Sequence, residues 1–224
     1  MIQTRLISRR EFARDAGIVL GAGFLLACGL PIAASEAEGE FKPNLFVFIG
    51  TDSKIRLICH RSEMGQGART AMAMLIAEEL EVDLAKIEII QADGDSKYSD
   101  QNTDGSKSVR LNWVRLSEAG AMARELLIAA AAARWKVPPN TCKASDGNVV
   151  HTLSGRKAKY GELAIEAENL AQSAESLPAH VLKTREARTL VGKPYPHVDL
   201  NGLLNGTARF GIDTELPGML HAMI

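Results

Sequence analysis

The sequence lacks the features that mark several common classes of protein. Its 26 Lys and Arg residues nearly balance 27 Asp and Glu residues, which leaves a net charge of −1. Charges of both signs are interspersed, so no broad basic surface is available for nucleic acid or anionic lipid. Neither a P-loop nor a dinucleotide glycine pattern appears, and ordinary nucleotide-binding folds are therefore unsupported. No internal repeat is visible.

Cysteine is also scarce, and no Cys-x-x-Cys spacing occurs. Cys28 lies in a segment that we expect to be removed, so Cys59 and Cys142 could form at most one disulfide. Cys59 and His60 are adjacent, but neighbouring side chains of a strand point to opposite faces, which disfavours joint metal ligation. The five histidines have no companions at ligand spacing and are more typical of surface or hydrogen-bonded core positions: His60, His151, His180, His197 and His221.

The N-terminus has the pattern of an export signal. Arg9 and Arg10 precede an apolar run from Ala16 to Ala34 that is too short and too glycine-rich for a membrane span. Residues 1–37 are therefore predicted to be a twin-arginine signal, which directs a folded protein to the periplasm. Two alternatives stay open: an ordinary secretory signal with a chance Arg-Arg pair, or a lipoprotein signal ending at Cys28.

The remaining chain predicts an α+β fold, with a mixed sheet and packed helices. With 46% hydrophobic residues, 224 residues suffice for one or two domains with real cores. Hydrophobic periodicity and turn residues predict strands over 45–49, 55–59, 86–92, 142–144 and 149–153, and helices over 70–80, 108–135 and 160–171.

These elements suggest a domain over 41–173 and a linker over 174–200 that contains one strand-like stretch. Residues 201–224 would begin a second domain, with a turn and a short strand over 206–213 and a second strand over 216–224. The pattern stops at Ile224 without a cap or a polar tail, which suggests a fragment.

Two loops are candidates for ligand binding because each leads directly into a predicted helix. In 61–67, Gly65 and Gly67 let the backbone approach a ligand, and the amide of Gln66 offers a donor and an acceptor. The free N–H groups of the following helix favour an anion such as phosphate. A purely structural strand-to-helix turn is the alternative.

The second loop, 102–108, combines hydroxyl groups, a glycine and a cation before a helix, which also suits an anion. The alternative to ligand binding is a purely structural role, in which Ser106 or Ser108 caps the N-terminus of the helix. Two such loops together favour one shared phosphate-bearing ligand. Elsewhere, Glu78 and Glu79 are adjacent on a helix and point apart, which favours a solvated face. Trp113 is most simply a core residue.

The first loop resembles a family signature. Glu63-Met64-Gly65-Gln66-Gly67, followed by 77–83, is similar to the xanthine dehydrogenase superfamily. Within it, the large subunits of isoquinoline 1-oxidoreductase and related exported aldehyde oxidoreductases are the better match. Further similarity lies in 147–151, 154–156 and 160–164. Residues 206–213 and 217–220 resemble the start of the family's hammerhead domain.

The resemblance implies a molybdopterin-binding domain. It places Gly65, Gln66 and Gly67 at the pterin and Gly105, Ser106, Lys107 and Ser108 at a second cradle, with the cofactor as the cytosine dinucleotide. Asp104 stands where the family usually has a glycine. Its carboxylate would repel a pyrophosphate, and Lys107 is placed to offset that charge.

The family's reaction is hydroxylation of an N-heterocycle or an aldehyde with water as the oxygen source. Electrons leave through 2Fe–2S clusters on a small partner subunit, with a cytochrome c as a possible acceptor. The catalytic glutamate is expected beyond Ile224, so the resemblance implies no catalytic residue and no metal ligand in this chain. The alternative is a non-catalytic cofactor-binding or assembly module.

Overall fold

A mixed three-stranded sheet forms one half of the fold. The computed structural model describes residues 40–173 and 178–220. β1 (Val47–Ile49) and β2 (Ile55–Cys59) form the predicted antiparallel hairpin, and β3 (Ile87–Gln91) lies parallel to β2 at the edge. The parallel pairing arises because the chain crosses over through a helix between β2 and β3. The predicted mixed sheet is confirmed.

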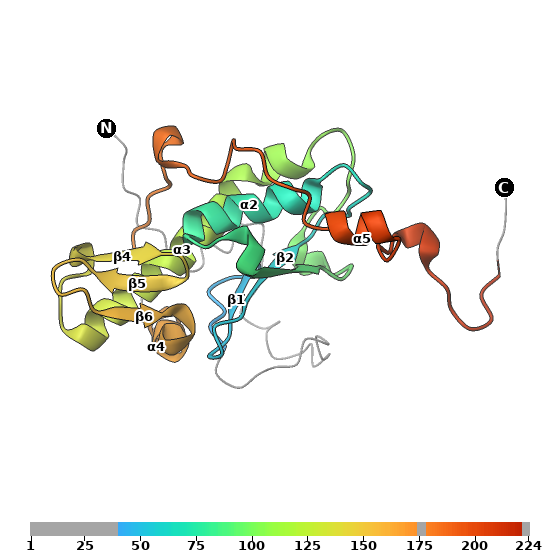
Figure 1. The fold of residues 1–224 in the computed structure, drawn as a ribbon. Coiled ribbons are helices and arrows are strands. Elements are labelled where there is room, and N and C mark those ends of the chain that lie inside the picture. Colours follow the sequence, from blue (N-terminus) through green and yellow to red (C-terminus); the bar gives the residue numbers. More distant parts are fainter. Residues whose placement is uncertain (1–39, 174–177, 221–224) are drawn as a thin grey trace.

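Two helices cover this sheet (Figure 1). α2 (Ala68–Leu80) follows the first candidate loop, and the 28-residue α3 (Ser108–Trp135) follows the second. The two helices run in the same direction, since residues around 76–79 of α2 meet Gly120 and Arg124 of α3. α3 ends at Lys136, which adopts a left-handed conformation before the two prolines.

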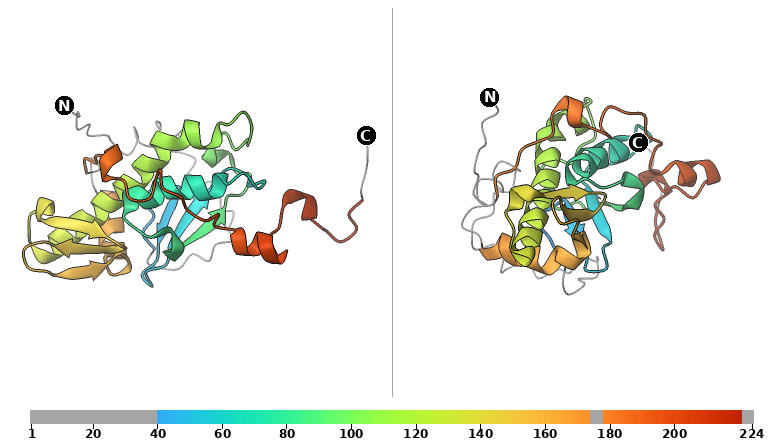
Figure 2. Two further views of the ribbon diagram at one scale, coloured as in Figure 1. Left: turned by 45° about the horizontal axis from the view of Figure 1, so that its top comes forward. Right: turned by 60° about the vertical axis from the view of Figure 1, so that its left-hand side comes forward.

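A second small sheet lies beyond the C-terminal half of α3 (Figure 2). β4 (Cys142–Ser145) and β5 (Asn148–His151) form the second predicted hairpin, and β6 (Lys157–Lys159) pairs with β5. The sequence did not reveal β6, because only Ala158 of its three residues is buried. α4 (Tyr160–Ser173) returns against α3.

The short elements lie in loops and in the C-terminal segment. They are η1 (Leu84–Lys86), η2 (Ser96–Tyr98), η3 (Pro139–Thr141), η4 (Arg185–Ala187), α5 (Leu200–Asn205) and η5 (Gly211–Asp213).

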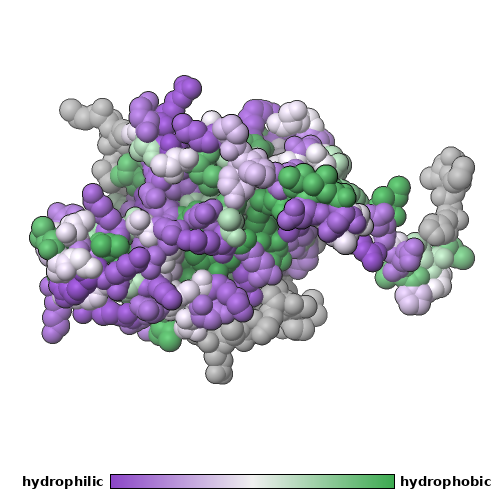
Figure 3. All heavy atoms as spheres, viewed as in Figure 1, coloured by the Kyte–Doolittle hydropathy of each residue, from purple (hydrophilic) through white to green (hydrophobic). Residues whose placement is uncertain are grey.

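One hydrophobic core joins both sheets. Phe41, Phe46, Leu80, Met122 and Leu126 are among its fully buried members, and side chains from both sheets and from α2, α3 and α4 belong to it. Much of the surface is polar, but apolar side chains gather in the middle of one face, between α2 and the C-terminal segment (Figure 3).

The prediction of a solvated face at Glu78 and Glu79 is wrong, since both carboxylates are buried. The connector over 183–191 crosses them. Glu78 accepts hydrogen bonds from the backbone N–H groups of three connector residues, at 2.7–3.1 Å, and from Nζ of Lys183. Glu79 accepts from the Lys183 backbone and from Arg124. Charge-assisted hydrogen bonds replace the lost water, so these acidic side chains can be buried.

The strands predicted near the C-terminus are also wrong where the structure describes them. Residues 206–220 contain only η5, and the strand-like stretch in the linker forms no strand within 178–200. A strand needs a partner for its backbone N–H and C=O groups, and none of the described strands pairs with this segment. Its apolar side chains remain exposed, as the exposed fractions of Ile212 (95%) and Leu220 (92%) show.

Several sequence-based predictions are not tested by this fold. The predicted export signal lies outside the described residues, as do positions 221–224. The boundaries of the two domains stay predictions. Among the helices that the structure describes, none has the length and hydropathy needed to cross a membrane.

The crossing of α2 and α3 depends on Gly120. A Cβ atom at this position would lie 2.4 Å from the carbonyl oxygen of Ile76 and 3.1 Å from Cβ of Glu79. Gly120→Ala should therefore force the helices apart and lower the free energy of unfolding by about 2 kcal/mol, measured by urea denaturation. Gly94→Ala is the control, because its Cβ would meet nothing within 4 Å. Equal stability of the two variants would contradict the close crossing.

Candidate functional site

The two candidate loops meet in one groove. A cavity of about 320 Å³ is lined by Gln66, Gly67 and the start of α2 on one side, and by Thr103, Asp104, Ser106 and the start of α3 on the other. The parallel packing of the helices brings both N-terminal ends together. The sequence predicted a shared ligand from the two loops, and the structure places the loops where one ligand can touch both.

Glu63 organises the first loop. Oε1 accepts hydrogen bonds from the backbone N–H groups of Gly65 (2.8 Å) and Gly67 (3.0 Å), and Oε2 accepts from that of Arg69 (3.0 Å). Gly65 and Gly67 have φ angles of 96° and 82°, which favour glycine. Burial opposes ionisation of Glu63, but the three N–H donors and nearby His197 outweigh it and lower the pKa of this carboxyl group.

The side chain of Gln66 folds back onto its own loop. Its Nε2 donates to the carbonyl oxygen of Ser62 (3.0 Å), and its Oε1 accepts from the backbone N–H of Met64 (2.6 Å). The amide therefore shapes the loop, while part of the residue lines the groove. The direct contact between this amide and a ligand that the sequence suggested stays a prediction, and the structure adds a bracing role within the loop.

In the second loop, Asp104 and Lys107 form an ion pair of 3.2 Å, as their opposite charges suggested. Gly105 (φ 52°) and Ser106 (φ 55°) are both in the left-handed region. A Cβ atom at Gly105 would lie 3.1 Å from Cε of Lys107, so the glycine lets the lysine lie over the turn. Ser108 begins α3, and neither it nor Ser106 caps the helix through its side chain. The capping alternative is wrong.

The buried side chain of Arg61 connects the two loops through hydrogen bonds. Its side chain is 2% exposed, and it donates from Nη1 to the carbonyl oxygen of Asn102 and from Nη2 to Asp100 (3.2 Å). Thr103 adds a hydrogen bond from Oγ1 to the carbonyl oxygen of Ser62 (3.0 Å). A long cation at the end of β2 thus fixes the second loop against the first. The sequence did not single out this role, because the two partners are about 40 residues away.

A buried polar cluster surrounds the neighbouring residue His60. His60 lies in contact with Asn112 (3.1 Å) and tilts against the ring of Phe46, over which the guanidinium group of Arg115 also lies. Burial, together with the positive charges of Arg115 and Arg61, lowers the pKa of His60 to about 4. Burial also lowers the pKa of Arg115, to about 10. His60 is therefore neutral at pH 7 and acts as a hydrogen-bonded core residue.

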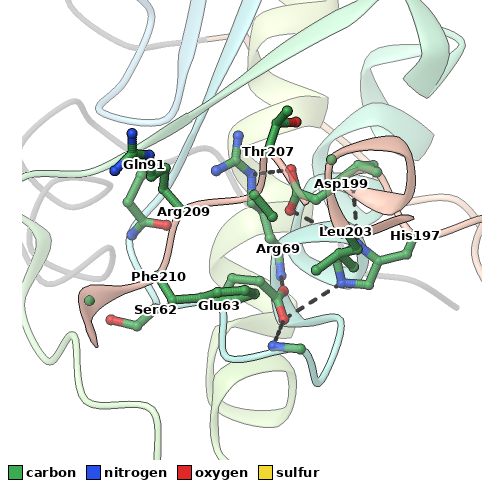
Figure 4. Close-up of a pocket in the computed structure, with 15 residues that line it drawn as sticks. Ser62, Glu63, Arg69, Gln91, His197, Asp199, Leu203, Thr207, Arg209 and Phe210 are labelled. Atoms are coloured by element: carbon green, nitrogen blue, oxygen red, sulfur yellow. Dashed lines mark hydrogen bonds and ion pairs between the residues drawn. The ribbon is translucent and has the colours of Figure 1, made fainter. Parts of the chain in front are cut away.

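A larger cavity of about 570 Å³ lies on the other side of the first loop (Figure 4). No sequence pattern indicated it, because one wall comes from the segment after the connector. His197 Nε2 lies 3.6 Å from Glu63, and Arg69 Nε lies 3.6 Å from Asp199. Val198 donates its backbone N–H to Thr70. These contacts fasten the segment to the start of α2.

Metal-binding features are absent from the part of the chain that the structure describes. No group of three or more His, Cys, Asp or Glu residues is arranged to hold a metal ion there. Cys59 and Cys142 are both buried and free. The polar residues that line the groove are Gln66, Thr103, Asp104, Ser106 and Ser108. Their amide and hydroxyl groups suit a polar organic ligand, whereas the carboxylate of Asp104 is unfavourable for an anion.

Comparison with known proteins identifies the family. Residues 4–198 match the model of the molybdopterin cofactor-binding domain. The chain belongs to this family. It is the cofactor-binding domain of xanthine dehydrogenase-like large subunits, as the loop at 63–67 indicated.

This molybdopterin-binding chain is similar to parts of three longer proteins. It is 30% identical to the beta subunit of isoquinoline 1-oxidoreductase of Brevundimonas diminuta, covering 99% of this chain and 34% of the relative. It is 30% identical to membrane-bound aldehyde dehydrogenase (pyrroloquinoline-quinone) of Gluconacetobacter polyoxogenes, covering 96% and 29%. It is 29% identical to a nicotinate dehydrogenase subunit of Pseudomonas putida, covering 97% and 18%. The chain thus spans about a third or less of these relatives.

A solved structure is also similar. Reconstituted CO dehydrogenase from Oligotropha carboxidovorans has a TM-score of 0.48 and 19% identity, over 61% of this chain and 17% of that one.

The bridge from Arg61 should hold the second loop of this molybdopterin-binding domain in place. Arg61→Met keeps the buried aliphatic stem but removes both hydrogen bonds to the loop. Amide hydrogen exchange over 100–106 should become about tenfold faster, which corresponds to about 1.4 kcal/mol of local stability. Arg110→Met, at an exposed site on α3, is the matched control. Unchanged exchange in Arg61→Met would refute the bridging role.

His60 should make stability depend on pH. Its pKa is about 4 in the folded chain, against an ordinary value of 6.5, so the unfolded chain binds a proton first as the pH falls. The free energy of unfolding should therefore decrease between pH 6.5 and 4, by up to about 3 kcal/mol. His60→Gln cannot take up this proton and should show a shallower slope in urea denaturation. Identical slopes would show that His60 is not buried as a neutral group.

Proposed function

We propose that this chain is the N-terminal, cofactor-holding part of a molybdenum hydroxylase large subunit. The whole subunit would oxidise an N-heterocycle or an aldehyde with water as the oxygen source. The convergence of the loops at 61–67 and 102–108 on one groove carries the proposal. The names of the relatives, which include oxidoreductases of isoquinoline, nicotinate and aldehyde, support the substrate class.

The groove has the chemistry to hold a phosphate-bearing pterin. At the start of α3, the backbone N–H groups of Ser108, Val109 and Arg110 have no acceptor among the described residues beyond the helix, as expected for a helix N-terminus. The hydroxyl groups of Thr103, Ser106 and Ser108 line the same groove. Asp104 is the unfavourable group, and its ion pair with Lys107 reduces its repulsion of a phosphate.

When bound, the molybdenum cofactor supplies the redox chemistry and the site of oxygen transfer. The residues of this chain would bind and orient it. Gly65, Gln66 and Gly67 would face the pterin, while Gly105, Ser106, Lys107 and Ser108 would face the phosphate side. We propose the cytosine dinucleotide form, in keeping with the resemblance of the glycine loop to exported hydroxylases.

The proposed setting follows from the same resemblance. The catalytic glutamate would lie beyond Ile224, and electrons would leave through 2Fe–2S clusters of a small partner subunit, with a cytochrome c as a candidate acceptor. The predicted twin-arginine signal supports a periplasmic location. A hammerhead domain that starts near residue 201 would bury the apolar side chains that are exposed in the C-terminal segment.

A non-catalytic cofactor-binding or assembly module is the second candidate. The groove between the two loops is the observation that favours it, because holding a ligand there requires no further chemistry from this chain. The downstream reading frame separates the two candidates. A continuing frame with a late glutamate motif supports the hydroxylase, and a stop codon after Ile224 supports the module.

The cofactor content of the full-length protein tests the proposal. Purified with its small subunit, it should contain molybdenum and release cytidine monophosphate on acid hydrolysis. Gln66→Ala removes the two hydrogen bonds that the Gln66 side chain makes within the first loop and should lower molybdenum content several-fold. Gln172→Ala, on α4, is the matched control because it makes the same change far from the groove. Metal analysis that finds no molybdenum in the wild-type complex would refute the function.

A further inference from the structure

The N-terminal end of α2 already carries an anion. The carboxylate of Glu63 sits within hydrogen-bond distance of three backbone N–H groups, those of Gly65, Gly67 and Arg69. Its side chain is only 10% exposed. From the sequence we expected the free N–H groups at the start of this helix to favour a ligand phosphate, and in the structure one of them, that of Arg69, already donates to Glu63.

The surroundings of Glu63 hold it in this position. His197 Nε2 lies 3.6 Å from Oε1, and the side chains of Arg69 and Asp199 pair beside it, as Figure 4 shows. The positive end of the helix dipole and the three donors both favour a negative charge at this point. A second anion placed here would have to displace the carboxylate or accept repulsion from it.

We infer that Glu63 is a positioning residue that acts as the internal anion of the glycine loop. It occupies one N–H group in the first turn of α2, that of Arg69, and holds Gly65 and Gly67 in their left-handed conformations. Repulsion from this carboxylate disfavours a second anion at the start of α2, so the phosphate of a ligand is expected nearer the start of α3, where Ser108 lines the groove. The expected position of the phosphate rests on the proposed function. The role of Glu63 in holding the glycine loop does not.

Chemical rescue provides the test. Glu63→Ala should lower the melting temperature of the full chain by about 4–8 °C, because three charge-assisted hydrogen bonds are lost. Formate is a small carboxylate that fits the vacated position. At ten times its dissociation constant it should restore about 3–5 °C, compared with chloride at equal ionic strength. Inorganic phosphate should also bind Glu63→Ala more tightly than the wild type.

Two further variants control for general effects. Asp83→Ala removes a carboxylate that accepts a single backbone hydrogen bond, at 3.0 Å from Ala85, and formate should not rescue it. Glu63→Gln keeps the shape and one acceptor oxygen, so it should fold, lose less stability and gain nothing from formate. It keeps the test decisive if Glu63→Ala does not fold, because stability equal to the wild type would then refute the role of the charge.

Equal stabilisation of the wild type and Glu63→Ala by formate would overturn the inference, and so would a Glu63→Ala variant that loses no stability. These measurements need no molybdopterin, so they stand or fall independently of the proposed function. In the complex with the small subunit, Glu63→Ala should also retain less molybdenum and cytidine monophosphate. If formate rescues Glu63→Ala but the wild-type complex contains no molybdenum, the proposed function is refuted. The inference that Glu63 holds the glycine loop then still stands.

Discussion

The parallel packing of α2 against α3 is the constraint on which the rest of the structure depends. Gly120 lets the two helices approach until only a hydrogen atom fits between its Cα and the backbone of Ile76. Because the helices then run side by side from nearly level starting points, their N-terminal ends lie next to each other. Each end carries one of the two candidate loops, and the groove between the loops is a direct result of this packing.

The connector over 183–191 and the segment that follows it run along α2 and contact both of its ends. Near the C-terminal end, Glu78 and Glu79 hold the backbone of 183–191, and near the N-terminal end Thr70 holds that of Val198. Backbone N–H groups of an irregular segment must find acceptors when they are covered. Buried carboxylates of α2 supply these acceptors, so the segment predicted to be a linker is in fact attached to the domain. Glu63 plays the same part for the glycine loop.

Much of the fold was predictable because local chemistry decides it. The hairpins have turn residues between apolar runs, and the helices have continuous stretches of good helix formers ended by Pro or by a left-handed residue. The family was predictable from the loop at 63–67 for the same reason, since the two glycines and Gln66 make a local structure that few other residues can form. β6 escaped notice, because a three-residue strand with one buried side chain has almost no pattern.

Local sequence was thus sufficient for the main elements, the two loops and the family to which they belong. Which groups are free to meet a ligand became visible only in the folded chain. Glu78 and Glu79 were expected on a solvated face, yet both accept hydrogen bonds from the backbone of a distant segment. Glu63 likewise accepts from backbone donors of its own loop, which the sequence did not reveal. Arg61 and His197 became part of the site through partners about 40 and 130 residues away. Hydrogen bonding between distant segments depends on how the helices pack, and no local pattern records that packing.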